Sequence, residues 1–435
     1  MAATTTAGSV RREGQPSSMT RRRWILLALV FIAIMINYVD RGNLSIAAPA
    51  MMKDFRITPE AMGVLLSAFF WTYAIFQIPA GLLVDRFGIR WSYTLAFLVW
   101  SLASAAIALA SGPGDVIGLR MVLGLAESIA PLASISFIRN NYSGKEQGFP
   151  TAVYIAGQNL GPAVGVLLGA ALLNQFGWRT MFAITGLGAL IWVPCWLFAA
   201  PSDGTRAERQ AARAAEEPPG PRPWTWRMVL SNGTFWAMAL SILLSSYYWY
   251  FVLTWVPSYL ILSRGFSTLG MGRILSTALF AMAVMNVVAG AAADRLAARI
   301  GVFRARLWFG VLGYVGTGAI LLLLVTDRSW SLPVLACSLC ATGIGNSTYW
   351  TITQYASPKN LVGRTVGFLN TISVAAGAAA PIITGWILGP QKDFGPAIVV
   401  AGVCPVLAGV CLLAAGSKGL SRIKSMLSGE AYAES

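Results

Sequence analysis

Four charged residues lie within long apolar stretches of the chain, where a charge is costly and therefore usually serves a function. Asp40 and Arg41 belong to the first apolar stretch, and Arg120 and Glu127 to the fourth. A guanidinium presents a planar pair of donors that fits a carboxylate. A carboxyl group among apolar residues can carry a proton. Together, these residue types could bind an organic anion and exchange protons.

The two carboxylates differ in their surroundings. Asp40 adjoins the fixed positive charge of Arg41, whereas Glu127 has Arg120 two helical turns away and otherwise Leu, Ala and Ile nearby. Loss of hydration favours the neutral form of Glu127. Because the chain has no His, protonation near neutral pH must use such a carboxylate. We expect Asp40 and Glu127 to couple protons. The alternative is two internal ion pairs that only lock the first and fourth spans together.

Amide and phenol groups in other apolar stretches are candidates for recognising substrate hydroxyls. Tyr73 and Gln77 are four residues apart and share one helical face. The run Tyr247-Tyr248-Trp249-Tyr250 covers all faces of its helix, so at most two of its rings can line a cavity. Trp350 could stack on a sugar ring or pack in the protein. The expected substrate-binding residues are Arg41, Arg120, Asn37, Tyr38, Tyr73, Gln77, Gln158, Tyr349, Trp350, Gln354 and Asn370.

The elements that carry these residues are membrane spans. Of 435 residues, 56% are hydrophobic and only 11% charged, whereas about a quarter are charged in a soluble domain. A span takes roughly 20 residues. Apolar stretches between polar breaks predict twelve helices, near 24–47, 60–83, 91–111, 114–138, 149–173, 179–199, 233–261, 270–292, 305–325, 332–356, 364–388 and 395–415.

A charged, Pro-rich segment at 201–232 divides the chain into two halves of six spans. We predict an N-terminal tail (1–23), an N-terminal six-helix bundle (24–200), this cytoplasmic linker, a C-terminal six-helix bundle (233–416) and a C-terminal tail (417–435). Of the 32 Lys and Arg residues, 23 fall on the side of both tails. By the positive-inside rule both termini are cytoplasmic. The net charge of +15 then reflects orientation rather than binding of nucleic acid.

The cysteines and the lack of catalytic residue sets argue against a metal site, a cofactor and enzyme activity. All five Cys fall in apolar stretches, and an odd number in such places is no disulfide framework. Cys337 and Cys340 lack the further ligands that a metal site needs. An enzyme or sensor would need a nucleophile–base pair, a metal set or a large extramembrane domain. We therefore expect no metal, no cofactor and no enzyme activity.

A short motif occurs after the second and again after the eighth span. The first copy is Gly81-Leu-Leu-Val-Asp85-Arg86-Phe-Gly88-Ile-Arg90, and the second is Gly290-Ala-Ala-Ala-Asp294-Arg295. Gly permits close helix approach, and the Asp–Arg pair can bridge to a neighbouring helix. We expect the gating residues Gly81, Asp85, Arg86, Gly88, Arg90, Asp294 and Arg295 to form a charge latch between the bundles in an outward-open state.

This pattern resembles the major facilitator superfamily over nearly the whole chain. The segment 37–45, NYVDRGNLS, is similar to the superfamily's anion:cation symporter branch, which carries hexuronates, galactonate, glucarate and phthalate. Arg120, Glu127, Tyr73, Gln77 and Gln158 also match that branch. One feature departs from that branch, and another is similar to a different branch of the superfamily. The seventh span has no Arg, unlike the span of vesicular members, and Gly157–Gly165 resembles the superfamily's antiporter motif.

The resemblance implies an all-α membrane protein with twelve transmembrane helices in two six-helix bundles. It implies proton-coupled symport of a small organic anion, such as a hexonate or hexuronate, by alternating access across the plasma (inner) membrane. An aromatic carboxylate could be the substrate instead, and a proton-coupled antiporter exporting drugs or metabolites is the second alternative. The adjacent Asp40–Arg41 pair favours symport. We expect the protein to act as a monomer in the lipid bilayer.

Overall fold

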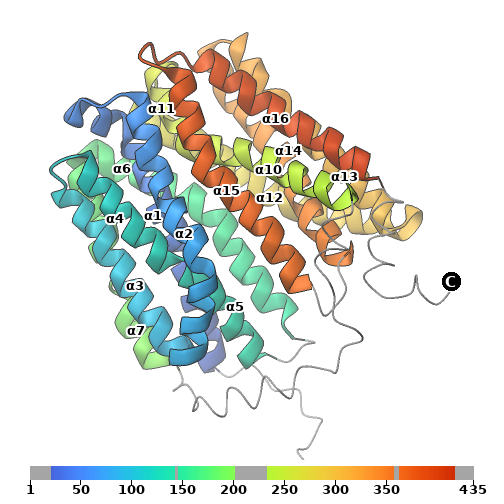
Figure 1. Ribbon diagram of the computed structural model, residues 1–435, viewed down its shortest axis with the longest axis horizontal. Helices are drawn as coiled ribbons and strands as arrows, with labels where there is room; N and C mark the ends of the chain where they lie inside the picture. The colour runs from blue at the N-terminus through green and yellow to red at the C-terminus, as the bar shows by residue number, and fades with distance from the viewer. Residues whose placement is uncertain (1–20, 143–145, 201–232, 357–361, 417–435) are drawn as a thin grey trace, which may run out of the picture.

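The computed structural model describes residues 21–142, 146–200, 233–356 and 362–416, and this described part is helical throughout, without strands (Figure 1). The predicted linker 201–232 and most of both predicted tails lie outside it. The helices are α1 (Arg21–Phe55), α2 (Pro59–Phe87), α3 (Ile89–Ala106), η1 (Ile107–Leu109), α4 (Pro113–Glu127), α5 (Ile129–Asn141), α6 (Gly148–Ala189), α7 (Trp192–Ala199), α10 (Gly233–Thr254), α11 (Val256–Leu262), α12 (Thr268–Ile300), α13 (Val302–Thr317), η2 (Gly318–Leu324), η3 (Arg328–Trp330), α14 (Ser331–Ala356), α15 (Val362–Leu388) and α16 (Phe394–Ala415).

Local sequence explains several helix ends. Thr58 caps α2 by accepting a hydrogen bond from the Ala61 amide, and Pro59 occupies the first helical turn, where no amide donor is needed. Ser267 caps α12 in the same way. Gly88 and Gly301 end α2 and α12 at φ 83° and 87°, a left-handed backbone that favours glycine. The duplicated motif therefore leads into the same type of turn in both halves.

The number of spans agrees with the twelve predicted. Ten helices in the described residues are long and apolar enough to cross a membrane. One of these, 148–199, is 52 residues long and turns at Gly177, so it supplies two spans. The twelfth is α14, which falls outside the ten because polar residues such as Asn346, Thr351 and Gln354 lower its hydropathy.

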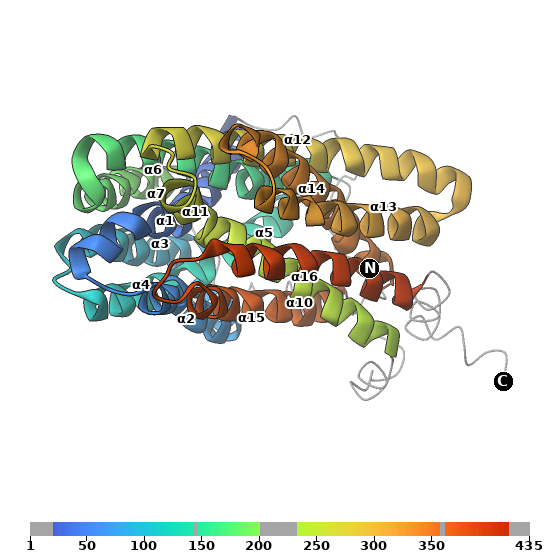
Figure 2. The same cartoon turned by 90° about the horizontal axis from the view of Figure 1, so that it is seen from above.

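The turn between the fifth and sixth spans consists of little more than Gly177. Its φ of 76° interrupts α6 without a loop. The α6 ribbon turns back on itself near one edge of the molecule (Figure 2). Just after the turn, the Trp178 indole and the Arg179 guanidinium donate to Asp54 at the end of α1, at 2.7 and 3.1 Å. The turn is thereby tied to the first span.

Glycines bring α1 and α6 close together. Gly157, Gly161, Gly165 and Gly169 recur every four residues and so share one face of α6. A Cβ at Gly161 would lie 2.7 Å from the Cβ of Tyr38, and one at Gly165 would lie 2.9 Å from the Cα of Val39. The Gly157–Gly165 segment therefore acts as a close-packing surface.

The two halves lie side by side and join mainly at one end, the end that carries the α1–α2 turn (Figure 1). There, a Cβ at Gly63 of α2 would meet the Pro381 carbonyl at 2.5 Å, and one at Gly385 of α15 would meet the Pro59 carbonyl at 2.6 Å. One buried hydrophobic cluster spans both halves at this closed end. Toward the opposite end, two of the buried clusters contain residues of the second half alone.

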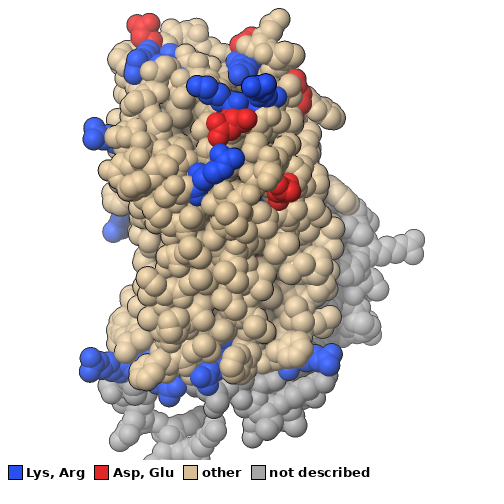
Figure 3. Space-filling view, turned by 90° about the vertical axis from the view of Figure 1, so that its left-hand side faces the viewer, with Lys and Arg blue, Asp and Glu red and all other residues tan. Residues whose placement is uncertain are grey.

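Charged side chains gather near the two ends of the molecule (Figure 3). On the face shown, a wide band between the ends carries no Lys, Arg, Asp or Glu, and the lower end shows only Lys and Arg. Large apolar side chains such as Ile78, Phe198 and Leu109 are exposed. An apolar surface of this extent is stable in lipid. The chain is a multi-pass membrane protein.

Candidate functional site

Arg41 and Glu127 form an ion pair in the interior of the first half. Arg41 Nε lies 2.9 Å from Glu127 Oε2. Glu127 ends α4, and a one-residue break at Ser128 separates it from α5, which places the carboxylate midway along the fourth span. Its side chain is fully buried, whereas that of Arg41 is 14% exposed. A buried ion pair is costly to form, which favours a functional role over a purely stabilising one.

Aromatic rings surround the Arg41 guanidinium. Its Cζ atom lies 5.0 Å from the centroid of Tyr38, 4.9 Å from that of Phe69 and 4.6 Å from that of Tyr73. Phe69 and Tyr73 stack on each other at 5.3 Å because they are four residues apart on one face of α2. Cation–π contacts of this kind favour a cation in partly desolvated surroundings. The rings hold the guanidinium while leaving its edge for a carboxylate.

Arg120 and Asp40 are buried without an ion-pair partner among the described residues. Arg120 lies 5.1 Å from the Phe69 ring, and its Nε and Nη1 atoms make no hydrogen bond there. Asp40 accepts a bond from Ser104 at 2.9 Å through one oxygen, while its other oxygen has no partner. The four charges thus form one ion pair and not the two that a purely structural role would predict. The unpartnered atoms of Arg120 and Asp40 are therefore available to a ligand or a proton.

The structure brings several predicted polar residues near this pair. Asn37 is buried on α1 with an unpartnered amide nitrogen. Gln77 is partly buried one turn beyond Tyr73. The Gln158 amide donates to the Tyr154 hydroxyl at 2.9 Å, and Tyr154 belongs to the same buried cluster as Phe69 and Tyr73. These residues come from α1, α2 and α6.

The predicted substrate-binding residues of the second half differ from one another in burial and in hydrogen bonding. Tyr349 is buried and donates to the Met238 carbonyl at 2.9 Å, inside a cluster of second-half residues. Its hydroxyl therefore forms a hydrogen bond within the second half and is not directed to the Arg41 site. Trp350 and Asn370 are partly buried, and Gln354 is exposed.

Several residues beside the site were missed from the sequence. Phe69 touches both arginines, Ser104 bonds Asp40, and Tyr154 bonds Gln158. Spacing could have indicated two of them, since Phe69 precedes Tyr73 by four residues and Tyr154 precedes Gln158 by four. Nothing in the sequence singles out Ser104 among the serines of α3.

In the second copy of the duplicated motif, the structure shows an ion pair within one half, and the latch between the bundles stays a prediction. Asp294 forms an ion pair with Arg306 of α13, a helix of the same half. This pair links α12 to α13 and not one bundle to the other, because α13 directly follows the turn at Gly301. In the first copy, the Arg90 guanidinium donates to the Leu197 carbonyl at 2.8 Å. Asp85 and Arg86 lie in the last turn of α2, away from the closed end.

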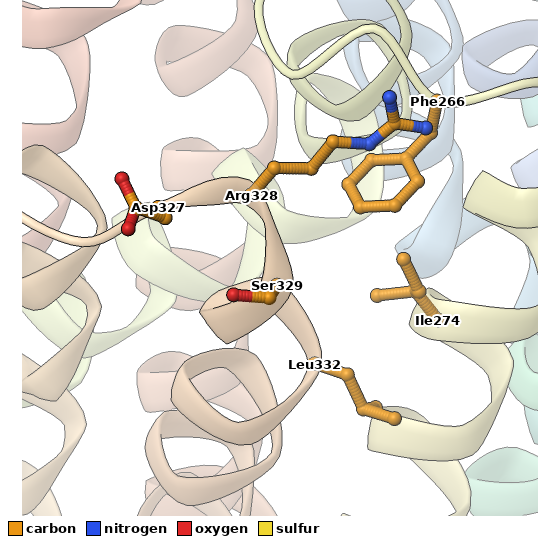
Figure 4. A pocket seen from close by; sticks show the side chains of 6 residues that line it. All are labelled: Phe266, Ile274, Asp327, Arg328, Ser329 and Leu332. Carbon is orange, nitrogen blue, oxygen red and sulfur yellow. The ribbon is translucent and has the colours of Figure 1, made fainter.

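A pocket elsewhere in the second half is separate from this site (Figure 4). Phe266, Ile274 and Leu332 supply apolar walls, and Asp327, Arg328 and Ser329 supply polar ones. The Arg328 guanidinium lies over the Phe266 ring at 4.2 Å. The pocket adjoins the start of α12 and α14, whereas the four intramembrane charges lie in α1 and α4. It contributes nothing to the Arg41–Glu127 site.

Comparisons with known proteins agree with this architecture. A family model described as Major Facilitator Superfamily matches residues 30–381. The chain is 28% identical to a hexuronate transporter of Bacillus subtilis (strain 168), over 88% of this chain and 92% of that protein. It is also 28% identical to a D-galactonate transporter of Escherichia coli O6:H1, over 91% and 96%.

A solved structure shows the same fold. The inward-facing, unoccupied structure of a bacterial homologue of the human lysosomal transporter Spinster matches with a TM-score of 0.71. It covers 93% of this chain and 98% of its own, at 17% identity. The fold predicted from the sequence is thereby confirmed. Because the family model matches most of its length, the chain belongs to the Major Facilitator Superfamily of membrane transporters.

Proposed function

We propose that this chain takes up an organic anion of the sugar-acid class by proton-coupled symport across the plasma membrane. Both termini are cytoplasmic in this proposal, so the closed end faces outward. Relatives named for hexuronate and D-galactonate support the substrate class. The protein acts as a monomer, and Asp40 and Glu127 carry the protons.

The Arg41–Glu127 ion pair is the observation that carries the proposal. A substrate carboxylate and the Glu127 carboxylate compete for the same guanidinium, because their charges and hydrogen-bonding geometry are alike. Protonation of Glu127 removes its charge and frees Arg41 for the substrate. Binding of the anion thereby requires binding of a proton.

The balance of charges explains why the anion and the proton bind together and move in the same direction. Asp40 and Glu127 offset Arg41 and Arg120, so an added anion leaves an excess negative charge in a site of low dielectric. A proton taken up with the substrate removes that excess. Return of the empty carrier requires release of the proton to the cytoplasm, after which Glu127 pairs again with Arg41.

Substitution of Glu127 by Gln tests the coupling directly, because Gln imitates the protonated carboxyl. We expect Glu127→Gln in proteoliposomes to exchange D-galactonate or D-glucuronate in counterflow at a rate near that of the wild type. It should fail to accumulate either acid when a pH gradient is imposed. Glu146→Gln, which changes an exposed carboxylate, should accumulate normally. If Glu127→Gln accumulates substrate as well as the wild type, the coupling role belongs to Asp40.

A thermal-shift panel tests the substrate class, since a ligand that binds only the folded state raises the melting temperature. Stabilisation by sugar acids, but not by lipophilic cations, is the expected result. Stabilisation by lipophilic cations alone would instead favour the antiporter class.

A further inference from the structure

Tyr250 of α10 is the residue through which the second half reaches the charged site of the first. Its ring lies 4.8 Å from that of Phe70, edge to face. Phe70 contacts Phe69 at 5.0 Å, and Phe69 faces Arg41 at 4.9 Å. Tyr250 packs both against the hydrophobic cluster that spans the two halves and against the mainly first-half cluster that includes Phe69 and Tyr73. It therefore sits where the two halves meet the site.

The position of the Tyr250 ring is fixed from the side of α15. A Cβ at Gly377 would lie 2.8 Å from Tyr250 Cζ, the carbon that bears the hydroxyl, and 2.9 Å from Phe70 Cδ1. Only glycine leaves room for both rings at this point. The Ser246 and Ser373 hydroxyls, 2.7 Å apart, hold α10 to α15 close by. The Tyr250 ring is thus packed between Phe70 and the backbone of α15 at Gly377.

The Tyr250 hydroxyl differs from those of its neighbours in the aromatic run. The Tyr247 hydroxyl pairs with Thr384 at 2.9 Å, and that of Tyr248 pairs with Ser338 at 2.6 Å. The Tyr250 hydroxyl makes no hydrogen bond to any residue that the structure describes. Its ring packs on Phe70, which contacts the Phe69 ring that faces Arg41. The donor and acceptor of the Tyr250 hydroxyl are therefore available to a ligand held at Arg41.

We infer that the Tyr250 hydroxyl is a specificity determinant that hydrogen-bonds a hydroxyl group of the substrate whose carboxylate Arg41 holds. This inference rests on the proposed function and adds to it a reason for selecting hydroxy acids. A carboxylate without hydroxyls gains no hydrogen bond from the phenol, so it binds more weakly than a hydroxy acid of the same length. The contact also joins a first-half residue to a second-half residue through one ligand.

Tyr250→Phe removes the hydroxyl and keeps the ring that packs on Phe70 and Gly377. We expect the variant to bind D-galactonate or D-glucuronate about tenfold more weakly by calorimetry, the loss typical of one hydrogen bond. Binding of hexanoate, a six-carbon carboxylate without hydroxyls, should not change. Tyr247→Phe is the matched control, because its hydroxyl bonds Thr384 within the second half, and it should bind the sugar acids as the wild type does.

The outcomes separate this inference from the proposed function. If wild-type protein binds neither sugar acid, the proposed function and the role of Tyr250 both fail. If the wild type binds them and Tyr250→Phe binds them equally well, only the role of Tyr250 fails. Equal weakening of sugar-acid and hexanoate binding would likewise overturn it, because it would indicate a general disturbance of the site. An unchanged melting temperature of the ligand-free variant confirms that the fold is intact.

Discussion

One guanidinium, that of Arg41, connects most of the groups that the proposed mechanism uses. It bonds Glu127, faces three aromatic rings and lies in the same helix as Asp40. Arg120 lies near the same Phe69 ring but has no carboxylate partner in the described chain. We therefore propose that Arg41 binds Glu127 when that carboxylate is charged and binds the substrate carboxylate when Glu127 is protonated. Arg120 then makes a second contact with the anion.

Replacement of Arg41 tests this assignment. Arg41→Ala should abolish binding of the sugar acids, and Arg41→Lys should restore little, because an ammonium lacks the planar pair of donors. Arg41→Ala should also destabilise the protein by about 3–5 kcal/mol, since it leaves a buried carboxylate unpaired. Calorimetry measures the first effect and thermal unfolding the second.

A double variant separates the two effects. Arg41→Ala with Glu127→Gln removes both charges, so it should recover most of the lost stability but none of the binding. Normal binding by Arg41→Ala would show that the substrate carboxylate is held elsewhere.

The sequence could identify the four intramembrane charges because charged residues are rare in the apolar stretches that contain them. It could not tell that Arg41 pairs with Glu127, because that choice depends on how α1 is rotated relative to α4 and on where α4 breaks at Ser128. The same limit applies to Tyr349, whose sequence environment resembles that of a site residue but whose hydroxyl bonds the Met238 carbonyl.

At the scale of elements, the glycine face of α6 determines how closely α6 approaches α1. At Gly165 the nearest atom to a new Cβ is the backbone Cα of Val39, which cannot move aside as a side chain could. Because Arg41 lies only two residues farther along α1, the spacing of the two helices also sets the position of the site. Helix packing and substrate binding are therefore linked here.

Gly165→Ala should lower the stability by about 1–3 kcal/mol, the usual cost of overpacking a close contact. Gly188→Ala, in the sixth span beyond the Gly177 turn, is the control, because a Cβ there would have nothing within 4 Å. It should leave stability unchanged or raise it by up to about 1 kcal/mol, owing to the better helix propensity of Ala. Thermal unfolding in detergent compares the two. An equal effect of both substitutions would show that the α1–α6 contact is not tight.

The limits of the spans were predictable to within a few residues at most helix ends. The breaks inside spans were not. The breaks near Ser128 and Trp255, and the change to a 3-10 helix after Thr317, leave no polar gap in the apolar pattern. Extensions such as α12 reaching Ile300 arise because the helix continues beyond the apolar stretch, where its charged end leaves the membrane.

At the scale of the whole molecule, the two halves are held together at the closed end by backbone contacts at glycines. A side chain at Gly385 would collide with the Pro59 carbonyl, which cannot give way without separation of α2 from α15. Opening of this end is the movement that alternating access requires.

Gly385→Ala should therefore shift the population toward conformations open at the closed end. Cysteines introduced along α2 near that end should react faster with a membrane-impermeant thiol reagent in the variant than in the parent. Gly367→Ala, at the other end of α15 where a Cβ would meet nothing within 4 Å, should leave the reaction rate unchanged. Equal rates in all three proteins would show that these glycine contacts do not hold the end closed.

The one-residue turn at Gly177 has a mechanical consequence. With no loop to absorb rotation, any swing of the fifth span is passed directly to the sixth, and the bonds of Trp178 and Arg179 to Asp54 pass it on to the first. We therefore expect the first, fifth and sixth spans to move together relative to the second half. A probe attached near the Gly177 turn would report the movement of these three spans together and not a local fluctuation of the chain.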